Sequence, residues 1–379
     1  MNIKQSALNI LMNHKAYIIA EIGVNHNGNL KLASDLIKKA KKCGANAVKI
    51  QTYNPELLVT PKANKASYQK NNSKTIESQL KMLEKYKLSN DDHKRLLLLA
   101  KKIDIDFLST PFDYKSLDFL VNSLKLKTIK ISSTDINNIP FLINIGSRNI
   151  NVIISSGMSN IEDIDVALSA LAFGNKYKKS RSKIVFDKKM HKNLFKKENR
   201  YLKSKVSLLH CTSEYPAPLD ELNLSVLPIL KERYNIKVGY SDHSGFINTG
   251  SIARALDASI IETHITMNKN YKGPDHKSSL NIREFEDYIN RIRITEKILG
   301  KSNKIITKSE RKNIKNSAKV LVAIKDISNG EKLTNKNLGI MRAGKGLKPI
   351  EYFDLLGKRV NRNIKIYSII KKNYLIQKI

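Results

Sequence analysis

Short apolar runs alternate with longer amphipathic segments along the chain up to about residue 300. The apolar runs predict strands at Tyr17–Gly23, Ala47–Gln51, Ile105–Ser109, Thr128–Ser132, Val152–Ser156, Val206–His210, Ile236–Tyr240 and Ile260–His264. Helix-like segments between them include Leu30–Cys43, Asp91–Lys102, Ile161–Phe173, Leu222–Tyr234 and Thr249–Leu256. Strands that alternate with helices form a parallel sheet, and eight such units close a (β/α)8 (TIM) barrel. We therefore predict a barrel over residues 1–299. An open doubly wound sheet is the alternative, but no G-x-G-x-x-G motif opens a helix.

The pattern changes after Leu299. Residues 300–317 are polar and charged, which predicts a linker. Residues 318–379 contain short apolar runs separated by turn signals such as Ser328–Gly330 and Gly344–Gly346, which predicts a small β-rich domain. Because about 60 residues are marginal for an independent core, we expect this domain to pack on its own barrel or on a partner's.

Two segments are longer than the connections of an ordinary barrel. Residues 52–90 follow the second predicted strand, and the motif at Ala66–Lys70 within them is predicted to fold over the site as a lid. Residues 175–205 are rich in lysine and predict a solvated helical excursion without chemistry.

Composition limits the class of protein. Hydrophobic residues make up 41% of the 379 residues, enough for a core and too many for a disordered chain. No stretch reaches the roughly 20 apolar residues of a membrane span, and the first 15 residues lack the apolar segment of a signal peptide. Cys43 and Cys211 lie far apart and outside any C-x-x-C spacing, which is typical of a reducing compartment. We expect a cytoplasmic protein without disulfides or a membrane segment.

The formal net charge of +34 raises the question of nucleic-acid binding. The lysines, however, are spread over many segments, and neither tryptophan nor a zinc-finger or RNA-stacking motif accompanies them. We therefore predict no specific nucleic-acid binding. A positive field is better suited to a small anionic substrate.

Polar side chains end nearly every predicted strand. They include Glu21, Lys49, Gln51, Thr110, Lys130, Ser133, Ser155, His210, Asp242, His243, Glu262 and His264. Barrel enzymes carry their active sites at this end of the strands. A single lysine at a strand end is usually a solvated side chain. Lys49 and Lys130, both inside apolar strands and both followed by hydroxyl residues, instead predict a clamp for a phosphate and a carboxylate.

The histidines leave more than one interpretation open. His210 and His243 end different strands, and two imidazoles at one end of a barrel can converge on a divalent ion. Either could equally be structural. The role of Glu262 and His264 is also open. The two side chains could form a hydrogen-bonded pair in the core, or they could support the residues of a site from behind.

The predicted barrel contains the motifs AEIGVNHNG, VKIQTY, STPFD, KISSTDINNIP, SSGM, LLHCTSEYPAP, GYSDHSG, IETHIT and GPDHKSSL. As a set, these motifs resemble those of the sialic acid synthase family. After the linker, KDISNGEKLTNKNL, MRAGKGLKP and LGKRV resemble the antifreeze-like (SAF) domain of the family, so the resemblance covers nearly the whole chain. It implies a condensation of phosphoenolpyruvate with N-acetylmannosamine to give N-acetylneuraminate and phosphate. The alternative is legionaminate or pseudaminate synthesis from a diacetamido-trideoxyhexose.

The resemblance also implies roles for individual residues. Lys49, Lys130, Ser133 and Ser155 match positions that hold phosphoenolpyruvate, with Thr110 nearby, and His210 and His243 match the ligands of Mn²⁺ or Mg²⁺. Glu21 matches an acidic residue beside the metal, and Gln51, Asp135 and Asp242 match sugar-contacting or proton-handling positions. Of these, Glu21, Lys49, Lys130 and Asp242 are the predicted catalytic residues. Arg342 matches an arginine that the SAF domain inserts into the neighbouring subunit's site in a domain-swapped homodimer. Asp135 stands where many members carry glutamate, so its carboxylate reaches less far.

Overall fold

The computed structural model describes residues 15–64, 78–179, 184–301 and 303–376. The chain divides into two compact units, residues 1–302 and 303–379. Within the described ranges, no helix has the length and apolar composition needed to cross a membrane. Cys43 and Cys211 are both buried and free.

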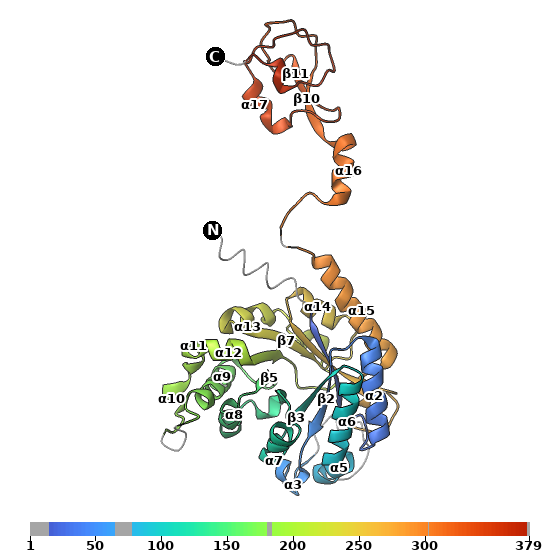
Figure 1. The fold of residues 1–379 in the computed structure, drawn as a ribbon, viewed down its shortest axis with the longest axis vertical. Helices are drawn as coiled ribbons and strands as arrows, with labels where there is room; N and C mark the ends of the chain where they lie inside the picture. Colours follow the sequence, from blue (N-terminus) through green and yellow to red (C-terminus); the bar gives the residue numbers. More distant parts are fainter. Residues whose placement is uncertain (1–14, 65–77, 180–183, 302, 377–379) are drawn as a thin grey trace. The chain divides into compact units, whose positions relative to one another are not determined.

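The first unit is a nearly closed parallel barrel (Figure 1). Its strands are β1 (Tyr17–Gly23), β2 (Ala47–Thr52), β3 (Asp106–Pro111), β4 (Thr128–Ile131), β5 (Asn151–Ser155), β6 (Val206–His210), β7 (Lys237–Asp242) and β8 (Ile260–Thr266). Hydrogen-bonded neighbours run β3-β2-β1-β8-β7-β6-β5-β4, so the first and last of the eight barrel strands pair with each other. The short β9 (Leu280–Asn281) pairs with β8. The predicted (β/α)8 barrel is confirmed.

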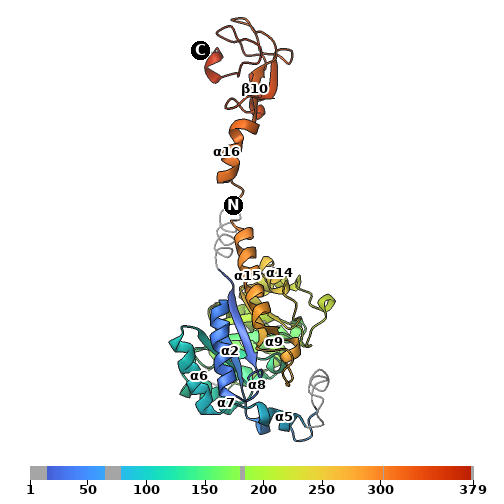
Figure 2. The same cartoon turned by 90° about the vertical axis from the view of Figure 1, so that its right-hand side faces the viewer.

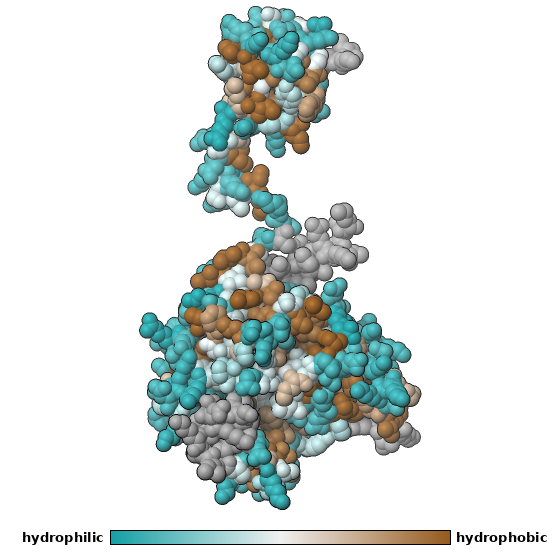
Figure 3. Space-filling model, turned by 180° about the vertical axis from the view of Figure 1, so that it is seen from behind, coloured by the Kyte–Doolittle hydropathy of each residue, from teal (hydrophilic) through white to brown (hydrophobic). Residues whose placement is uncertain are grey.

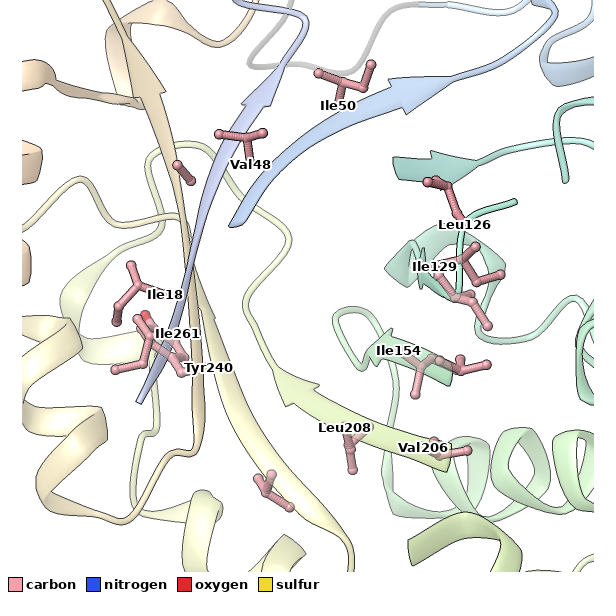
Figure 4. Close-up of a cluster of buried hydrophobic side chains, with 14 of the residues drawn as sticks. Ile18, Val48, Ile50, Leu126, Ile129, Ile154, Val206, Leu208, Tyr240 and Ile261 are labelled. Carbon is pink, nitrogen blue, oxygen red and sulfur yellow. The ribbon is translucent and has the colours of Figure 1, made fainter. Parts of the chain in front are cut away.

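Alternate residues of each strand face either the barrel interior or the surrounding helices. Ile19, Ala47, Leu108, Ile153, Leu209 and Ile260 pack together in the interior. Their neighbours pack outward, among them Ile18, Val48, Ile154, Leu208, Tyr240 and Ile261 (Figure 4). Counting on by two from the interior residues places Glu21, Lys49, Gln51, Thr110, Ser155 and Glu262 on the inner face near the carboxyl ends. Hydrophobic layers thus fix which polar side chains point into the barrel.

The barrel helices are α2 (Leu30–Cys43), α6 (Asn90–Lys102), α7 (Tyr114–Asp118), α8 (Ile139–Gly146), α9 (Ile161–Lys176), α13 (Val226–Tyr234), α14 (Thr249–Ala255) and α15 (Ile282–Leu299). Several begin at capping boxes, as at Ser89 with Asp92 and at Asn281 with Glu284, which satisfy the first free N–H groups. Helix α2 lies between α6 and α15 on the outside of β1 and β2 (Figure 2).

The two long connections have helices of their own. Helices α3 (Pro55–Leu58) and α5 (Gln79–Tyr86) follow β2, and the motif predicted as a lid, Ala66–Lys70, lies outside the described residues. The second connection contains α10 (Lys188–His191), α11 (Leu194–Lys197) and α12 (Asn199–Lys205). It is helical as predicted, but it is not only a solvated excursion, because Leu194, Phe195 and Leu202 are buried in the core of the barrel unit.

The second unit has a separate core. Strands β10 (Lys319–Ala323) and β11 (Leu338–Arg342) pair antiparallel, and α17 (Tyr352–Leu355) follows them. Buried residues from all parts of this unit, including Leu321, Leu333, Leu338, Val360 and Ile370, form one cluster. The segment predicted as a linker contains a helix, α16 (Lys308–Ser317), whose first turn is capped by Thr307 and Glu310.

Candidate active site

A cavity of about 470 Å³ opens at the carboxyl ends of the barrel strands. Its lining includes eight of the predicted site residues, namely Glu21, Lys49, Gln51, Thr110, Lys130, Ser133, Ser155 and His243. They come from six different strands or the loops that follow them, and the inward register of the strands brings them together.

Two buried lysines form the floor of this cavity. Lys49 Nζ lies 2.7 Å from Glu21 Oε2 and donates to Thr110 Oγ1 at 3.2 Å. Lys130 Nζ donates to Ser155 Oγ at 2.6 Å. Glu262 lies between the two lysines, with carboxylate oxygens 3.8 Å from Lys49 Nζ and 3.5 Å from Lys130 Nζ. The floor therefore contains two cations whose charges are balanced by two carboxylates.

The two carboxylates differ in proton affinity although they share Lys49. Burial raises the pKa of Glu21 to about 7, against the opposing charge of Lys49. Burial also acts to raise the pKa of Glu262, but the charges of Lys130 and Lys49 outweigh it and hold that pKa below its usual range. At neutral pH Glu262 is ionised, whereas Glu21 is poised to exchange a proton.

The lysines respond to the same surroundings. Burial lowers the pKa of Lys130. Burial acts in the same direction on Lys49, but the nearby charges of Glu21 and Glu262 outweigh it and raise the pKa of Lys49. A buried cation is stable only with an opposite charge close by, so Glu21 and Glu262 are what allow two lysines to be buried here.

The loop after β5 contacts the hydroxyl of Ser133 directly. The backbone N–H of Gly157 donates to Ser133 Oγ at 3.1 Å. A Cβ atom on Gly157 would lie 2.8 Å from Ser133 Oγ and 2.2 Å from Ser213 Oγ, both too close for real atoms. Any larger residue at position 157 would displace one or both of these hydroxyls.

The two predicted metal ligands are held in the manner of metal-binding imidazoles. His243 Nδ1 lies 2.6 Å from the carbonyl oxygen of Thr212, and His210 Nε2 lies 2.7 Å from that of Leu222. A carbonyl can only accept, so each ring donates there and keeps its other nitrogen as a lone pair. Burial lowers the pKa of His243 to about 4 and also lowers that of His210, so both rings remain neutral, as ligation requires.

His210 and His243 nevertheless line different cavities. His210 lies against an adjoining hollow of about 610 Å³ that shares Met158 and Ser213 with the first cavity. Within the described part of the chain, no three His, Cys, Asp or Glu side chains are grouped so as to hold a metal ion. A divalent ion here would have at most these two imidazoles as protein ligands, and water or substrate oxygens would take its other positions.

The sequence of the chain matches a known family over most of its length. The NeuB family model matches residues 36–304, and the SAF domain model matches residues 318–375. The chain belongs to the NeuB family. It is therefore an enzyme of the sialic acid synthase type, a transferase that joins its substrates by condensation, as its sequence motifs predict.

Several relatives resemble this NeuB-family enzyme over nearly their whole length. It is 42% identical over 358 residues to the N,N'-diacetyllegionaminic acid synthase of Campylobacter jejuni, covering 94% of this chain and 99% of that protein. It is 35% identical over 350 residues to the N,N'-diacetyllegionaminic acid synthase of Legionella pneumophila, covering 92% of this chain and 91% of that one. The crystal structure of N-acetylneuraminic acid (sialic acid) synthetase from Leptospira borgpetersenii matches with 30% identity and a TM-score of 0.63, covering 80% of this chain and 91% of that chain.

Four predicted site residues of the NeuB-family chain do not line the main cavity. They are Asp135, Asp242, His210 and Arg342. Asp242 has the outward register of Tyr240, and its carboxylate accepts hydrogen bonds from the hydroxyls of Tyr240, Ser244, Thr249 and Tyr288 and from the Ser244 N–H. These contacts tie β7 to α14 and α15, which is a structural position.

The other three predicted site residues lie outside the main cavity for different reasons. Asp135 is buried in the short helix after β4 and accepts from Asn138 Nδ2 at 3.0 Å, and burial raises its pKa. His210 shares the outward register of Leu208 and stacks beside Tyr240. Arg342 ends β11 in the second unit, where it is exposed.

Sequence reasoning gave too little weight to Glu262 and His264, which both line the cavity. Glu262 Oε2 and His264 Nδ1 are buried, and in the part of the chain that the structure describes neither has a hydrogen-bond partner, although Glu262 Oε2 lies 3.8 Å from the ammonium of Lys49. Unsatisfied buried atoms of this kind are sites that a bound ligand can satisfy. The available signal was the spacing of two from the interior residue Ile260. Gln79 and Leu83 also line the cavity, and no sequence pattern pointed to them. Tyr215 lines it too and lies in the quoted motif LLHCTSEYPAP, but it was given no role.

Proposed function

We propose that this NeuB-family enzyme condenses phosphoenolpyruvate with a diacetamido-trideoxyhexose, releasing phosphate and a legionaminate-type nine-carbon 2-keto acid. The single observation that carries the condensation is the pair of buried lysines facing one cavity among three hydroxyls. The choice of sugar is supported by the names of the two Campylobacter and Legionella relatives. N-acetylmannosamine, the sugar first expected from the sequence, is the second candidate, supported by the Leptospira structure.

Phosphoenolpyruvate fits the cavity floor by charge and by hydrogen bonding. Its phosphate and carboxylate would pair with Lys49 and Lys130, while Thr110, Ser133 and Ser155 donate hydroxyl hydrogens to the remaining oxygens. Glu262 stays between the lysines and keeps both protonated. Gln51, on the same face of β2 as Lys49, lies beside this floor and would contact the sugar.

The proposed reaction proceeds by electron-pair movements that these residues can support. The methylene carbon of phosphoenolpyruvate attacks the aldehyde carbon of the open-chain sugar. A C–C bond forms as the π bond of the aldehyde breaks, and the aldehyde oxygen takes that electron pair and a proton from solvent to become a hydroxyl. Positive charge develops at the carbon that bears the phosphate, where water adds as Glu21 accepts its proton. The tetrahedral intermediate then breaks its C–O bond to phosphate, and the lysines stabilise the departing anion. A divalent ion held by His210 and His243 would supply Lewis-acid polarisation of the aldehyde.

We also propose that two copies of the chain form a domain-swapped homodimer in the cytoplasm. The match of residues 318–375 to the SAF domain supports this assembly, in which Arg342 would reach the cavity of the partner subunit. The two free buried cysteines are compatible with a reducing compartment.

The test is phosphate release from phosphoenolpyruvate with Mn²⁺, comparing kcat/KM for the diacetamido-trideoxyhexose and N-acetylmannosamine. We expect turnover with both, a higher kcat/KM for the first, and loss of activity after chelation of the metal. Lys130→Met should lower kcat/KM by roughly 10²-fold or more, as expected when a charge-stabilising group is removed. Lys127→Met, which removes an exposed lysine just before the same strand, is the matched control. Absence of phosphate release with either sugar would rule out the condensation.

A further inference from the structure

The cavity has an apolar wall opposite its charged floor. Leu58, Val59, Leu83 and Phe112 form this wall, and all four line the cavity. They belong to a separate hydrophobic cluster with buried Val24, Tyr53, Met82 and Tyr86. Tyr53 holds this cluster in place, because its ring lies edge-on to that of Phe112 at 6.4 Å and its hydroxyl donates to the Leu83 carbonyl oxygen at 3.1 Å. The wall is therefore a built surface with its own support.

Helix α5 adds an amide to this wall. Gln79 and Leu83 are four residues apart, so they lie one above the other on the same helix face. Both line the cavity. Within the described residues, no hydrogen bond is found for the side-chain amide of Gln79, which leaves a donor and an acceptor next to the apolar surface. Gln51, on β2, supplies a second amide to the same cavity, nearer the lysines.

The two candidate sugars differ in groups that such a surface can distinguish. N-acetylmannosamine has one acetamido group and hydroxyls at its remaining carbons. The diacetamido-trideoxyhexose has a second acetamido group and a terminal methyl in place of two hydroxyls. Against an apolar wall the methyl group is favoured, while a hydroxyl buried there has no hydrogen-bond partner.

We propose that the apolar wall and Gln79 are the specificity-determining surface of this site. The wall takes the terminal methyl of a deoxy sugar, and the Gln79 amide pairs with the second acetamido group. This inference rests on the proposed function and deepens it, because it assigns the choice of sugar to residues 58, 59, 79, 83 and 112. A hydrophobic pocket rejects an added hydroxyl by only about 10²-fold in kcat/KM, which sets the scale of the preference expected here.

The experiment is a pair of isosteric substitutions in one hydrophobic cluster. Val59→Thr puts a hydroxyl into the wall at constant volume, and Val24→Thr makes the same change in the cluster away from the cavity. We expect Val59→Thr to reduce the preference for the deoxy sugar by about threefold or more, with the KM for phosphoenolpyruvate unchanged. Val24→Thr should leave the preference as in the wild type. Gln79→Met should lower kcat/KM for the diacetamido sugar and leave that for N-acetylmannosamine unchanged.

Binding of each sugar is measured by calorimetry beside turnover, so that failure of the inference and failure of the proposed function are distinguishable. Condensation of both sugars with equal kcat/KM, or a preference that Val59→Thr and Gln79→Met leave unchanged, would overturn the inference and leave the condensation intact. If no phosphate is released but the deoxy sugar binds more tightly, and Val59→Thr removes that difference, the proposed function fails and the specificity surface stands. Equal binding of both sugars without turnover overturns both.

Discussion

At the scale of single residues, the two carboxylates beside Lys49 have opposite pKa shifts for identifiable reasons. Glu262 contacts both lysines and accepts from Ser241 Oγ at 2.9 Å, so its charged form is stabilised from three sides. Among the described residues, Glu21 has only Lys49 at ion-pair distance, and burial dominates its pKa. Two glutamates in one cavity therefore have different roles: Glu262 remains an anion, and Glu21 is able to accept a proton.

Glu21→Gln should abolish the acidic limb of the pH profile. Glu21 must be ionised to accept the proton of the attacking water, and its pKa is raised to about 7, so wild-type kcat/KM should rise as the pH increases through that value. In the variant, kcat should fall by roughly 10²- to 10⁴-fold, and the residual rate should not rise through this range. Steady-state phosphate release between pH 5 and 9 measures both.

Glu286→Gln provides the matched control, because it removes an exposed carboxylate from α15. It should leave the rate and the profile unchanged. Near-normal turnover of Glu21→Gln with an unaltered pH profile would show that Glu21 does not transfer the proton.

At the scale of elements, the position of the loop after β5 depends on how closely its backbone contacts neighbouring side chains, more than on the turn preferences of its own residues. Gly157→Ala places a methyl group against Ser133 Oγ and Ser213 Oγ, and one or both hydroxyls must move. Overpacking of this kind costs about 1–3 kcal/mol, and here part of it displaces a hydroxyl that we assign to phosphoenolpyruvate. We expect a several-fold higher KM for phosphoenolpyruvate and a lower Tm.

Ser159→Ala is the comparison for this loop. Ser159 Oγ donates to the Gly157 carbonyl oxygen at 3.3 Å, so its removal alters the loop without adding bulk. The KM for phosphoenolpyruvate should stay close to the wild-type value in this variant. A folded Gly157→Ala enzyme with an unchanged KM would remove Ser133 from the binding site.

The strands also explain how far sequence could predict the site. All eight strands were predictable because apolar runs end in polar residues. Whether a given side chain points into the barrel or toward the helices was not predictable, because a strand buried on both sides lacks the alternation of polar and apolar residues. Leu208 and Leu209 look alike in the sequence, yet one packs outward and the other inward. Lys49 and Lys130 end strands and line the cavity, whereas His210 and Asp242 also end strands but face outward, and the sequence did not distinguish the two cases. Gln79 and Leu83 enter from a long connection that no strand pattern fixes.

At the scale of the whole molecule, each of the two units has a main hydrophobic core of its own. The second unit also leaves large apolar side chains on its surface (Figure 3). Ile350 and Phe353 are 84% and 81% exposed, which is unusual for side chains of this size. A unit with its own small core and an apolar surface is suited to association, in agreement with the proposed swapped dimer.

The dimer can be tested by combining two inactive chains. Lys130→Ala removes a lysine from the barrel unit, and Arg342→Ala removes the arginine from the SAF unit, so each variant alone should be inactive. If Arg342 completes the cavity of the partner subunit, a mixed dimer has one barrel with Lys130 served by one SAF unit with Arg342. Co-expression with two affinity tags and tandem purification should then yield about half of the wild-type turnover per dimer, since one of two sites is intact.

The control for this complementation is a mixed dimer of Lys49→Ala with Lys130→Ala. Both substitutions lie in the barrel unit, so no exchange of SAF units can restore a complete site, and this dimer should be inactive. If Arg342 acted within its own chain, the first mixture would be equally inactive, because every site would lack either Lys130 or Arg342. If the two tagged chains did not purify together, the homodimer itself would be excluded. Recovery of activity in the first mixture alone therefore requires that two chains share one active site.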